Sequence, residues 1–527
     1  MRSQSAVSIA VARTLAGCAA VLAAGAATLA RADDSFLKPD TLVISASRYD
    51  RTQGAVASLT AGTTQLANTD IATVTAVAGN LYPEVWNNAA VDGSFGVTSP
   101  ISLWDVDARD GRLLGALRVP TEQVVTSFSS KSELGLHIAR DCDGLHLTFM
   151  GYASPGVGAL DVSNSDAVPG QDPTNPVTFA FGSTYAFHRT IVAVNERGEL
   201  SFTPTVDYGG NNGRAALLGS NGLYYSVGNA NNGNAAAFGA ANGTDPDVTE
   251  TTGLEVVRPI DARRADVAIP PGNSAEVDPL VQYSFTKGKS DKPGKDDNYR
   301  GVSEYQGALY FTKGSGSNGM DTLYTVGTLP TVADAAAQTI SVVPGFPTDS
   351  AKATGGNFTP FAVFFANPTT LYVSDEGSGN ATDAATHAGL EKWSLVGGTW
   401  QLDYVLTNGL LGVVATDLDG YDGPYPDVTT VGLRNLTGRV NRDGTVTLWA
   451  TTSTASASGD QGADPNRVVA ITDLLAATTM TPRVAAEAFA TLAGPTYGVV
   501  YRGVAYVPRE SDRGDGRRRD GWSHADR

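Results

Sequence analysis

Four arginines recur at one place in a repeated sequence pattern, and their side chains could bind an anion. Three of them precede an aromatic residue by ten positions, and the fourth lies in a last, incomplete copy of the pattern. They are Arg214, Arg300, Arg439 and Arg502. A guanidinium group is a planar fork of N–H donors that matches a carboxylate or a phosphate. The pattern therefore predicts a substrate-binding set of arginines. The alternative is structural: each arginine pairs with an aspartate of the neighbouring repeat.

Other residues could transfer protons or hold a metal ion. His188, beside an arginine in "YAFHRTIVAV", is the candidate catalytic residue. The loop "ATDLDGYDGPYPD" alternates acids with glycine, as calcium-binding loops do. Its acids are Asp417, Asp419, Asp422 and Asp427. The loop lacks the spacing of an EF-hand, so a solvated acidic loop is the alternative.

A second acidic stretch, "DEGSGNATDAATHAG", gathers titratable side chains after an apolar run. These are Asp375, Glu376, Asp383 and His387. Loops at strand ends commonly carry functional residues, and an insertion without function is the alternative. The sequence has no HExxH, CxxC, P-loop or GxSxG pattern. Calcium is therefore the only cofactor that the sequence suggests.

The elements that position these residues are short strands. Each arginine opens a pair of apolar runs around a turn rich in Gly, Asn and Asp, which is typical of a hairpin. A copy around "NFTPFAVFFANPTTLYVSDEG" has Ala362 in the arginine position, and a weaker copy is "SELGLHIARDCDGLHLTFMGY". A further hairpin such as "GLEKWSLVGGTWQLDYVL" follows each copy. Repeated four-stranded units predict an all-β protein, a single β-propeller whose first strands line a central channel.

The two ends of the repeat region complete each other. "VVYRGVAYVPR", 499–509, is a first strand without a partner, and "TLVISASR", 41–48, is a second strand without a predecessor. We expect both to lie in one blade, which closes the propeller and leaves no open sheet edge. This arrangement gives six blades. The alternative is seven, with the seventh in 48–98 or 229–290.

The N-terminus has the pattern of an export signal. Positive charge and an Ala/Leu/Val run end at Ala30-Arg31-Ala32, which predicts cleavage after residue 32. "LAGC" offers an alternative, a lipoprotein acylated at Cys18. After cleavage at residue 32 only Cys142 remains, so an internal disulfide is excluded. We expect a secreted or periplasmic protein with a signal peptide at 1–32, the propeller at 33–509 and a disordered charged tail at 510–527.

The charge balance limits the partners. The formal net charge of the 527 residues is −17, which argues against nucleic-acid binding. No run after the signal predicts a transmembrane segment. We therefore expect a monomer whose partner is a small anionic molecule or an acidic glycan.

Several motifs resemble a group of exported propeller-like proteins of bacteria and fungi, most of them uncharacterised. They include "DGSFGVTSPI", "RGVSEYQGALYFTKGSGSNG" and "SGDQGADPNRVVAITD", and the resemblance spans the mature chain. Some secreted propellers of similar style are phytase-like esterases, lactonases or polysaccharide lyases directed at uronates. The resemblance implies a lyase or hydrolase acting on a uronate-containing glycan or on a phosphate or carboxylate ester. The alternative is a noncatalytic binding or scaffold propeller.

Overall fold

The structure is a computed structural model. It describes residues 35–50, 52–60, 62–67, 73–75, 96–128, 134–141, 143–154, 156–160, 162–164, 189–205, 207–208, 211–229, 252–260, 262–263, 277–279, 297–314, 319–348, 358–379, 387–414, 428–455 and 464–509. The predicted signal peptide and the charged tail lie outside these residues.

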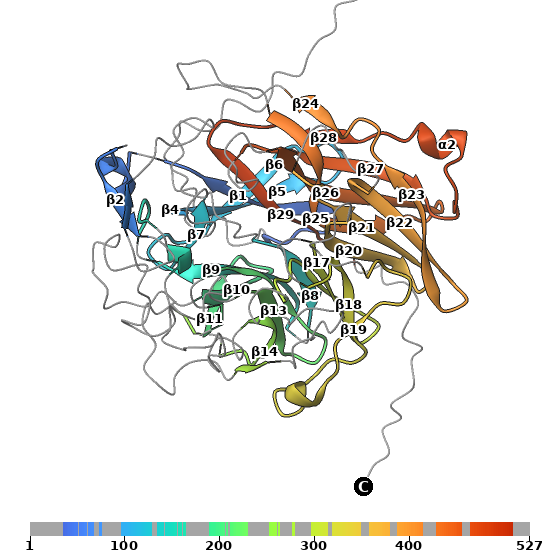
Figure 1. Ribbon diagram of the computed structural model, residues 1–527, viewed down its shortest axis with the longest axis horizontal. Coiled ribbons are helices and arrows are strands. Elements are labelled where there is room, and N and C mark those ends of the chain that lie inside the picture. Colours follow the sequence, from blue (N-terminus) through green and yellow to red (C-terminus); the bar gives the residue numbers. More distant parts are fainter. Residues whose placement is uncertain are drawn as a thin grey trace, which may run out of the picture. The chain divides into compact units, whose positions relative to one another are not determined.

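Six antiparallel sheets form the six blades of a β-propeller (Figure 1). Blade 1 contains β29 (Val499–Tyr506), β1 (Thr41–Arg48), β5 (Ile101–Asp107) and β6 (Leu113–Arg118). Blade 2 contains β8 (His137–Arg140), β9 (Leu145–Ala153), β10 (Arg189–Asn195) and β11 (Leu200–Thr205), with β7 (Val124–Phe128) and β4 (Val97–Ser99) added beside the end of β9. Blade 3 contains β12 (Gly213–Leu218), β13 (Tyr224–Gly228), β14 (Gly253–Val257) and β15 (Val277–Pro279).

The other three blades follow in chain order. Blade 4 contains β16 (Val302–Tyr305), β17 (Ala308–Lys313), β18 (Thr322–Val326) and β19 (Ser341–Val342). Blade 5 contains β20 (Pro360–Asn367), β21 (Thr370–Asp375), β22 (Gly389–Val396) and β23 (Thr399–Leu406). Blade 6 contains β25 (Val428–Val440), β26 (Thr445–Ala455), β27 (Val468–Leu474) and β28 (Ala490–Ala493), and β24 (Gly412–Val414) pairs with the start of β25.

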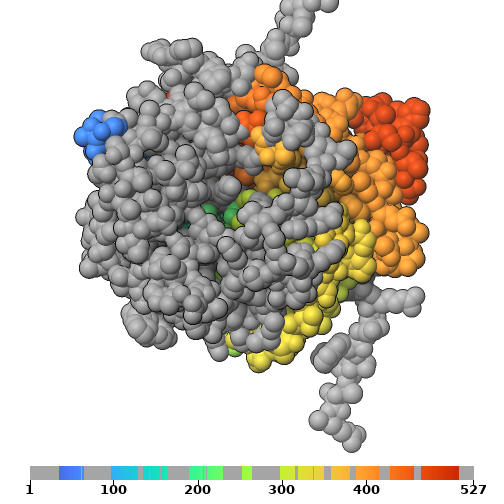
Figure 2. Space-filling model, in the orientation of Figure 1, coloured from blue at the N-terminus to red at the C-terminus, as the bar shows by residue number. Residues whose placement is uncertain are grey.

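The few remaining elements are small. β2 (Gln65–Ala67) pairs with β3 (Thr73–Thr75), and the helical turns are η2 (Ala55–Ser58), η3 (Val162–Asn164), η6 (Ala335–Ala337) and α2 (Pro482–Ala485). Thr481 caps α2, because its hydroxyl accepts from the Val484 N–H, and α2 lies on the outer surface, where Figure 2 shows it in red. Among the described residues, no helix has the length and apolar character needed to cross a membrane.

The first strands of the blades form a closed ring. β8 contacts β12, β12 contacts β16, β16 contacts β20, β20 contacts β25, β25 contacts β29, and β29 contacts β8. Six blades are therefore confirmed rather than seven. Within 229–290 the described strands β14 and β15 belong to blade 3, and the described strands of 48–98 form no separate blade.

The two ends of the repeat region close the ring, as the sequence predicts. β1 pairs with β29 from Leu42 opposite Tyr506 to Arg48 opposite Val499, and β5 pairs with the other edge of β1. Blade 1 therefore has strands from both ends of the repeat region. Figure 1 shows β1 and β29 in this sheet, where they are hydrogen-bonded neighbours.

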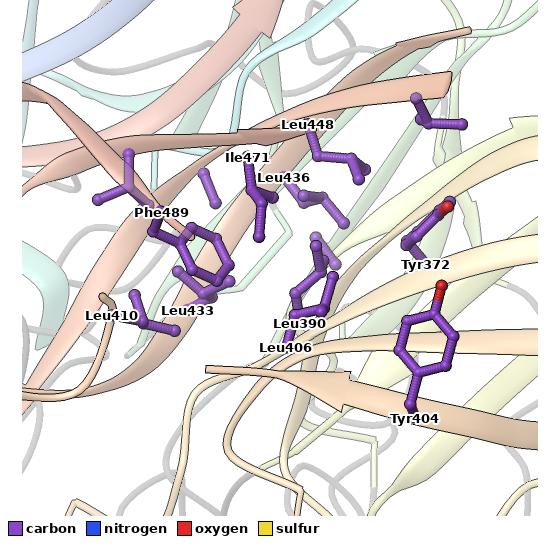
Figure 3. Close-up of a cluster of buried hydrophobic side chains, with 14 of the residues drawn as sticks. Tyr372, Leu390, Tyr404, Leu406, Leu410, Leu433, Leu436, Leu448, Ile471 and Phe489 are labelled. Carbon is purple, nitrogen blue, oxygen red and sulfur yellow. The ribbon is translucent and has the colours of Figure 1, made fainter. Parts of the chain in front are cut away.

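Apolar side chains between blades hold the ring together. Figure 3 shows one such cluster, in which Tyr372 and Leu390 of blade 5 face Leu448 and Ile471 of blade 6. The hairpin between β22 and β23 turns at Gly397 and Gly398, both with positive φ, as a two-residue turn of this kind requires. Side chains at alternate strand positions thus form the packing between the blades, and polar groups lie at the strand ends.

Candidate functional site

A β-bulge occurs at the same level in four of the inner strands. At least one residue of the inner strand has no partner on the second strand there. Such a bulge changes the direction in which the side chain of the unpaired residue points. The skipped residues are Arg214 in β12, Phe361 in β20, Arg434 in β25 and Arg502 in β29. In β25 the bulge is one residue longer and also contains Asn435. All three arginines are at least nine-tenths buried.

Arg300 lies at the corresponding point of blade 4, just before β16. Its N–H donates to the carbonyl of Thr312, and the hydroxyl of Thr312 donates at 2.6 Å to the carbonyl of Phe361. The same kind of contact recurs around the ring: the hydroxyl of Ser374 donates to the carbonyl of Arg434, and that of Thr451 donates to the carbonyl of Arg502. A second-strand hydroxyl of one blade thus fixes the bulge of the next.

Arg439 does not share this position, because it pairs regularly with Thr447 outside the bulge, and its predicted substrate-binding role stays a prediction. It lies toward the far end of β25, where Nη1 is 3.3 Å from both Asp40 Oδ1 and the Tyr506 hydroxyl. Its guanidinium carbon is 5.4 Å from the centre of the Tyr506 ring, and its side chain is 32% exposed. Arg434, five residues earlier, takes the equivalent place in blade 6.

The spacing pattern misplaced Arg439 for a geometric reason. Counting ten residues back from an aromatic works only when the hairpins have equal length. β25 has 13 residues and β12 has six, so the bulge of β25 lies farther from its turn. The prediction for Ala362 was displaced by one residue for a similar reason. Ala362 pairs with Ser374, and the bulge contains Phe361.

Three blades meet at one buried carboxylate. Glu376 follows β21, and its Oε1 is 3.4 Å from Arg300 Nη2 while its Oε2 is 3.2 Å from Arg434 Nε. The ring of Phe361 lies between the two arginines, with its centre 5.9 Å from the guanidinium carbon of Arg300 and 5.3 Å from that of Arg434. Ion pairing and cation–π contact together offset the cost of burying these charges. Of the four predicted arginines, Arg300 therefore pairs with a carboxylate of the neighbouring blade, which is a glutamate rather than the expected aspartate.

The other two arginines make different contacts. Arg214 Nη2 donates at 3.2 Å to Asn229 Oδ1 and at 2.8 Å to Asn298 Oδ1. Asn298 precedes β16, so this contact joins blades 3 and 4. Arg502 has its guanidinium carbon 5.9 Å from the centre of the Phe128 ring, at the end of β7. Arginines from four blades thus occupy corresponding backbone positions in the inner ring.

A lysine adds further positive charge in blade 4. Lys313 ends β17, is fully buried, and has its Nζ 2.9 Å from Asp321 Oδ1. Burial raises the pKa of Asp321, and the nearby charges of Lys313 and Arg300 oppose this rise. The same end of the propeller therefore contains acids and bases in a low-dielectric environment, in which their interactions are strong.

The second acidic stretch contains two neighbouring carboxylates, Asp375 and Glu376, that make different contacts. Asp375 accepts from Thr359 and Gly377 N–H groups at 2.7 and 2.8 Å, which fixes the end of β21, whereas Glu376 binds the arginines. Burial raises the pKa of Asp375 to about 6, although these hydrogen bonds lower it. Asp383 lies outside the described residues.

His387 forms a dyad with a carboxylate that the sequence did not reveal. Its Nδ1 is 2.5 Å from Glu391 Oε1, and Trp393 Nε1 donates at 2.7 Å to Glu391 Oε2. Burial raises the pKa of Glu391 to about 7, and the hydrogen bond to Glu391 raises the pKa of His387. The imidazole side chain remains 21% exposed, whereas Glu391 is fully buried.

The remaining predicted site residues are not part of the described structure. His188 and the four aspartates of the predicted calcium loop, Asp417, Asp419, Asp422 and Asp427, all lie outside it. Within the part of the chain that the structure describes, no group of three or more His, Cys, Asp or Glu side chains could hold a metal ion. The catalytic role of His188 and the calcium site stay predictions.

No protein-family model and no curated protein matches this chain. Similar solved structures include a GH43_1 enzyme from Xanthomonas citri complexed with xylose, with 13% identity, 59% of this chain and 87% of that chain covered, and a TM-score of 0.28. They also include a PL25 ulvan lyase bound to -[GlcA(1-4)Rha3S]-, with 11% identity, 83% and 97% coverage, and a TM-score of 0.30. A third is the hemagglutinin-neuraminidase ectodomain of parainfluenza virus 5, with 10% identity, 69% and 72% coverage, and a TM-score of 0.31.

These similarities are too low to carry an argument about this chain. The six-bladed fold is established by the strand pairing of this chain alone. The resemblance of its motifs to exported propeller-like proteins stays a prediction.

Proposed function

We propose that the protein is an exported enzyme that acts on an extracellular anionic substrate. The substrate is a uronate-containing glycan or a phosphate or carboxylate ester, and the enzyme is a lyase or a hydrolase. The observation that supports the proposal is a set of four buried arginines, Arg214, Arg300, Arg434 and Arg502, at corresponding backbone positions in four blades. Arg434 replaces Arg439 in this set.

The chemistry of the set suits an anion. Donors that a folded scaffold holds in place neutralise a carboxylate or phosphate without the cost of reorganising at the moment of reaction. β-Bulges, rather than flexible loops, hold three of the arginines, and Glu376 orients two of them. Such a site would bind the anionic group, and a neighbouring titratable side chain would move the proton.

A screen for activity tests this proposal. The purified mature chain would be incubated with acidic glycans and with phosphate and carboxylate esters, with and without a chelator. Turnover of an anionic substrate, together with loss of turnover in Arg214→Gln, is the expected result. Arg197→Gln is the matched control, because Arg197 lies in an exposed turn of blade 2. Turnover that is equal in both variants would contradict the proposed role of the arginines.

The second candidate is a noncatalytic scaffold, and the ion pairs of Glu376 with Arg300 and Arg434 favour it. A scaffold predicts no turnover of any substrate in the panel and the same stability with and without anionic ligands. An enzyme predicts turnover, and stabilisation by the ligand according to its affinity.

Export can be tested separately. The full chain would be expressed in a bacterium, and the N-terminus of the exported protein would be determined by mass spectrometry. Cleavage after Ala32 is expected. A lipid-modified Cys18 at the new N-terminus would favour the lipoprotein alternative, and retention of the intact N-terminus inside the cell would contradict export.

A further inference from the structure

We propose that blade 6 binds a single halide ion, such as chloride, between the guanidinium group of Arg467 and the hydroxyl of Thr454. The site lies apart from the inner-ring arginines and does not depend on the proposed function. Two buried polar atoms point to it. Arg467 Nε and Thr454 Oγ1 have no hydrogen-bond partner among the described residues, and both residues are at least nine-tenths buried.

Arg467 is a buried cation whose contacts are all neutral. Its Nη1 donates at 3.2 Å to the Thr491 hydroxyl, and its Nη2 donates to the Leu410 carbonyl and at 3.1 Å to the Thr430 hydroxyl. Burial lowers the pKa of this guanidinium, and no acid in the described part of the chain opposes that effect. An arginine side chain does not deprotonate in proteins, so its positive charge stays unbalanced in the interior.

The strand pairing places Thr454 beside this guanidinium. Thr454 lies opposite Thr430 on β25, and the hydroxyl of Thr430 contacts Arg467. Arg467 is itself opposite Thr452 on β26, because the Thr452 N–H donates to its carbonyl and the Thr452 hydroxyl accepts from its N–H. Thr452 and Thr454 are two residues apart on one strand, so their side chains and that of Arg467 lie on the same face of the sheet.

The surroundings of this face make an unbalanced charge costly. It packs against blade 5 through the apolar cluster of Figure 3, which includes Leu410 and Leu433. Leu410 supplies the carbonyl that Arg467 contacts, and Val469, two residues after Arg467, belongs to the same cluster. In such a low-dielectric environment a single opposite charge is attracted strongly.

The chemistry of the site selects a small monovalent anion. A water molecule could hydrogen-bond to Nε and to the Thr454 hydroxyl, but it would leave the charge of Arg467 unbalanced. A divalent oxyanion would leave an unbalanced charge of the opposite sign. Both unpartnered atoms are buried, so a glycan could not reach them, whereas a single ion needs only a brief local opening of the fold. A halide accepts hydrogen bonds from both donors and carries the one charge that is needed.

Thermal unfolding of the mature chain in sodium chloride and in sodium gluconate at equal ionic strength tests the site, because gluconate is too large to enter it. Chloride at 100 times its dissociation constant multiplies the ratio of folded to unfolded chain by about 100, which for a chain of this length raises Tm by about 3 °C. Bromide should act as chloride does. A Tm in chloride that is equal to or lower than the Tm in gluconate would overturn the proposal.

Thr454→Val keeps the shape of the side chain and removes its hydroxyl. The variant should bind chloride about 10- to 100-fold more weakly, the range for losing a hydrogen bond to a charged group. Thr322→Val is the matched control. Thr322 is also fully buried with an unpartnered hydroxyl, but Lys313, the cation opposite it, is already paired with Asp321. This control should respond to chloride as the wild type does, and an equal response in both variants would contradict the site.

Arg467→Met removes the charge and should abolish the dependence of Tm on chloride. If this variant does not fold, a crystal structure of the wild type grown in bromide decides the question. Anomalous scattering should then place a bromide ion within hydrogen-bonding distance of Arg467 Nε and the Thr454 hydroxyl. A water molecule or no density at that position, or an Arg467→Met variant that responds to chloride as the wild type does, would overturn the proposal.

Discussion

Removal of the Glu376 carboxylate should strongly destabilise the propeller. In Glu376→Ala, the guanidinium groups of Arg300 and Arg434 lose the carboxylate that lies 3.4 and 3.2 Å from them. Both side chains are almost fully buried, so water cannot replace the lost partner. Breaking a buried pair by removing one partner costs about 3–5 kcal/mol. Glu376→Gln keeps one oxygen acceptor and the shape, so its cost should be smaller.

Denaturant unfolding followed by tryptophan fluorescence measures this cost. The midpoint should fall while the slope with denaturant concentration stays the same, since the surface exposed on unfolding does not change. The control is Glu199→Ala, because Glu199 is exposed and accepts one hydrogen bond from Asn195. That change should alter stability by no more than about 0.5 kcal/mol.

Acetate provides a second measurement on the same variant. If the two arginines form an anion site, acetate should enter the space left by Glu376→Ala and stabilise the variant more than the wild type. At ten times its dissociation constant the gain is about 1.4 kcal/mol. If Glu376→Ala unfolds at the same midpoint as the wild type and acetate has no effect, then the carboxylate does not hold these arginines and the reasoning is refuted.

Three further predictions concern the whole fold. Burial raises the pKa of Asp207 and Glu391 to about 7, so the folded chain binds protons that the unfolded chain has lost above about pH 4. Stability should therefore be highest in mild acid and fall as the pH rises through 7. Asp207→Asn should make Tm depend less on pH. An unchanged dependence of Tm on pH in this variant would contradict the role of Asp207. Deletion of 41–48 removes the second strand of blade 1 and should abolish folding, as judged by circular dichroism; a folded monomer would contradict closure by both termini. If the 417–427 loop binds calcium, a chelator should lower Tm and added calcium should restore it; no shift at saturating chelator would remove the metal site.

The blade architecture could be predicted from sequence because it depends on local patterns. Paired apolar runs around Gly- and Asn-rich turns mark the hairpins, and the two unpartnered strands at 41–48 and 499–509 imply closure. The pairing of β1 with β29 confirms this reasoning. Arg214 lies in the bulge because its hairpin keeps the common length, and Arg502 was recognised from the incomplete last copy of the pattern, whose partner strand β1 comes from the other end of the repeat region.

The site could be predicted only in part, because its contacts cross between blades. Arg434 was missed because the longer bulge and longer strands of blade 6 shift the spacing, and the pattern selected Arg439 instead. Glu376 follows Asp375 directly, and the sequence does not tell which of the two faces the channel arginines. Glu391 reads as an ordinary strand residue, since the contacts with His387 and Trp393 that distinguish it exist only in the folded blade.

Calorimetric titration of a short oligogalacturonate tests most directly whether the inner-ring arginines bind an anion. The wild type should bind, and its affinity should fall with added salt. Arg214→Gln and Arg502→Gln should each bind about 10- to 100-fold more weakly, the range for losing a hydrogen bond to a charged group, while Arg197→Gln binds as the wild type does. Equal binding by all four proteins, or binding by none of them, would contradict an anion site at these arginines.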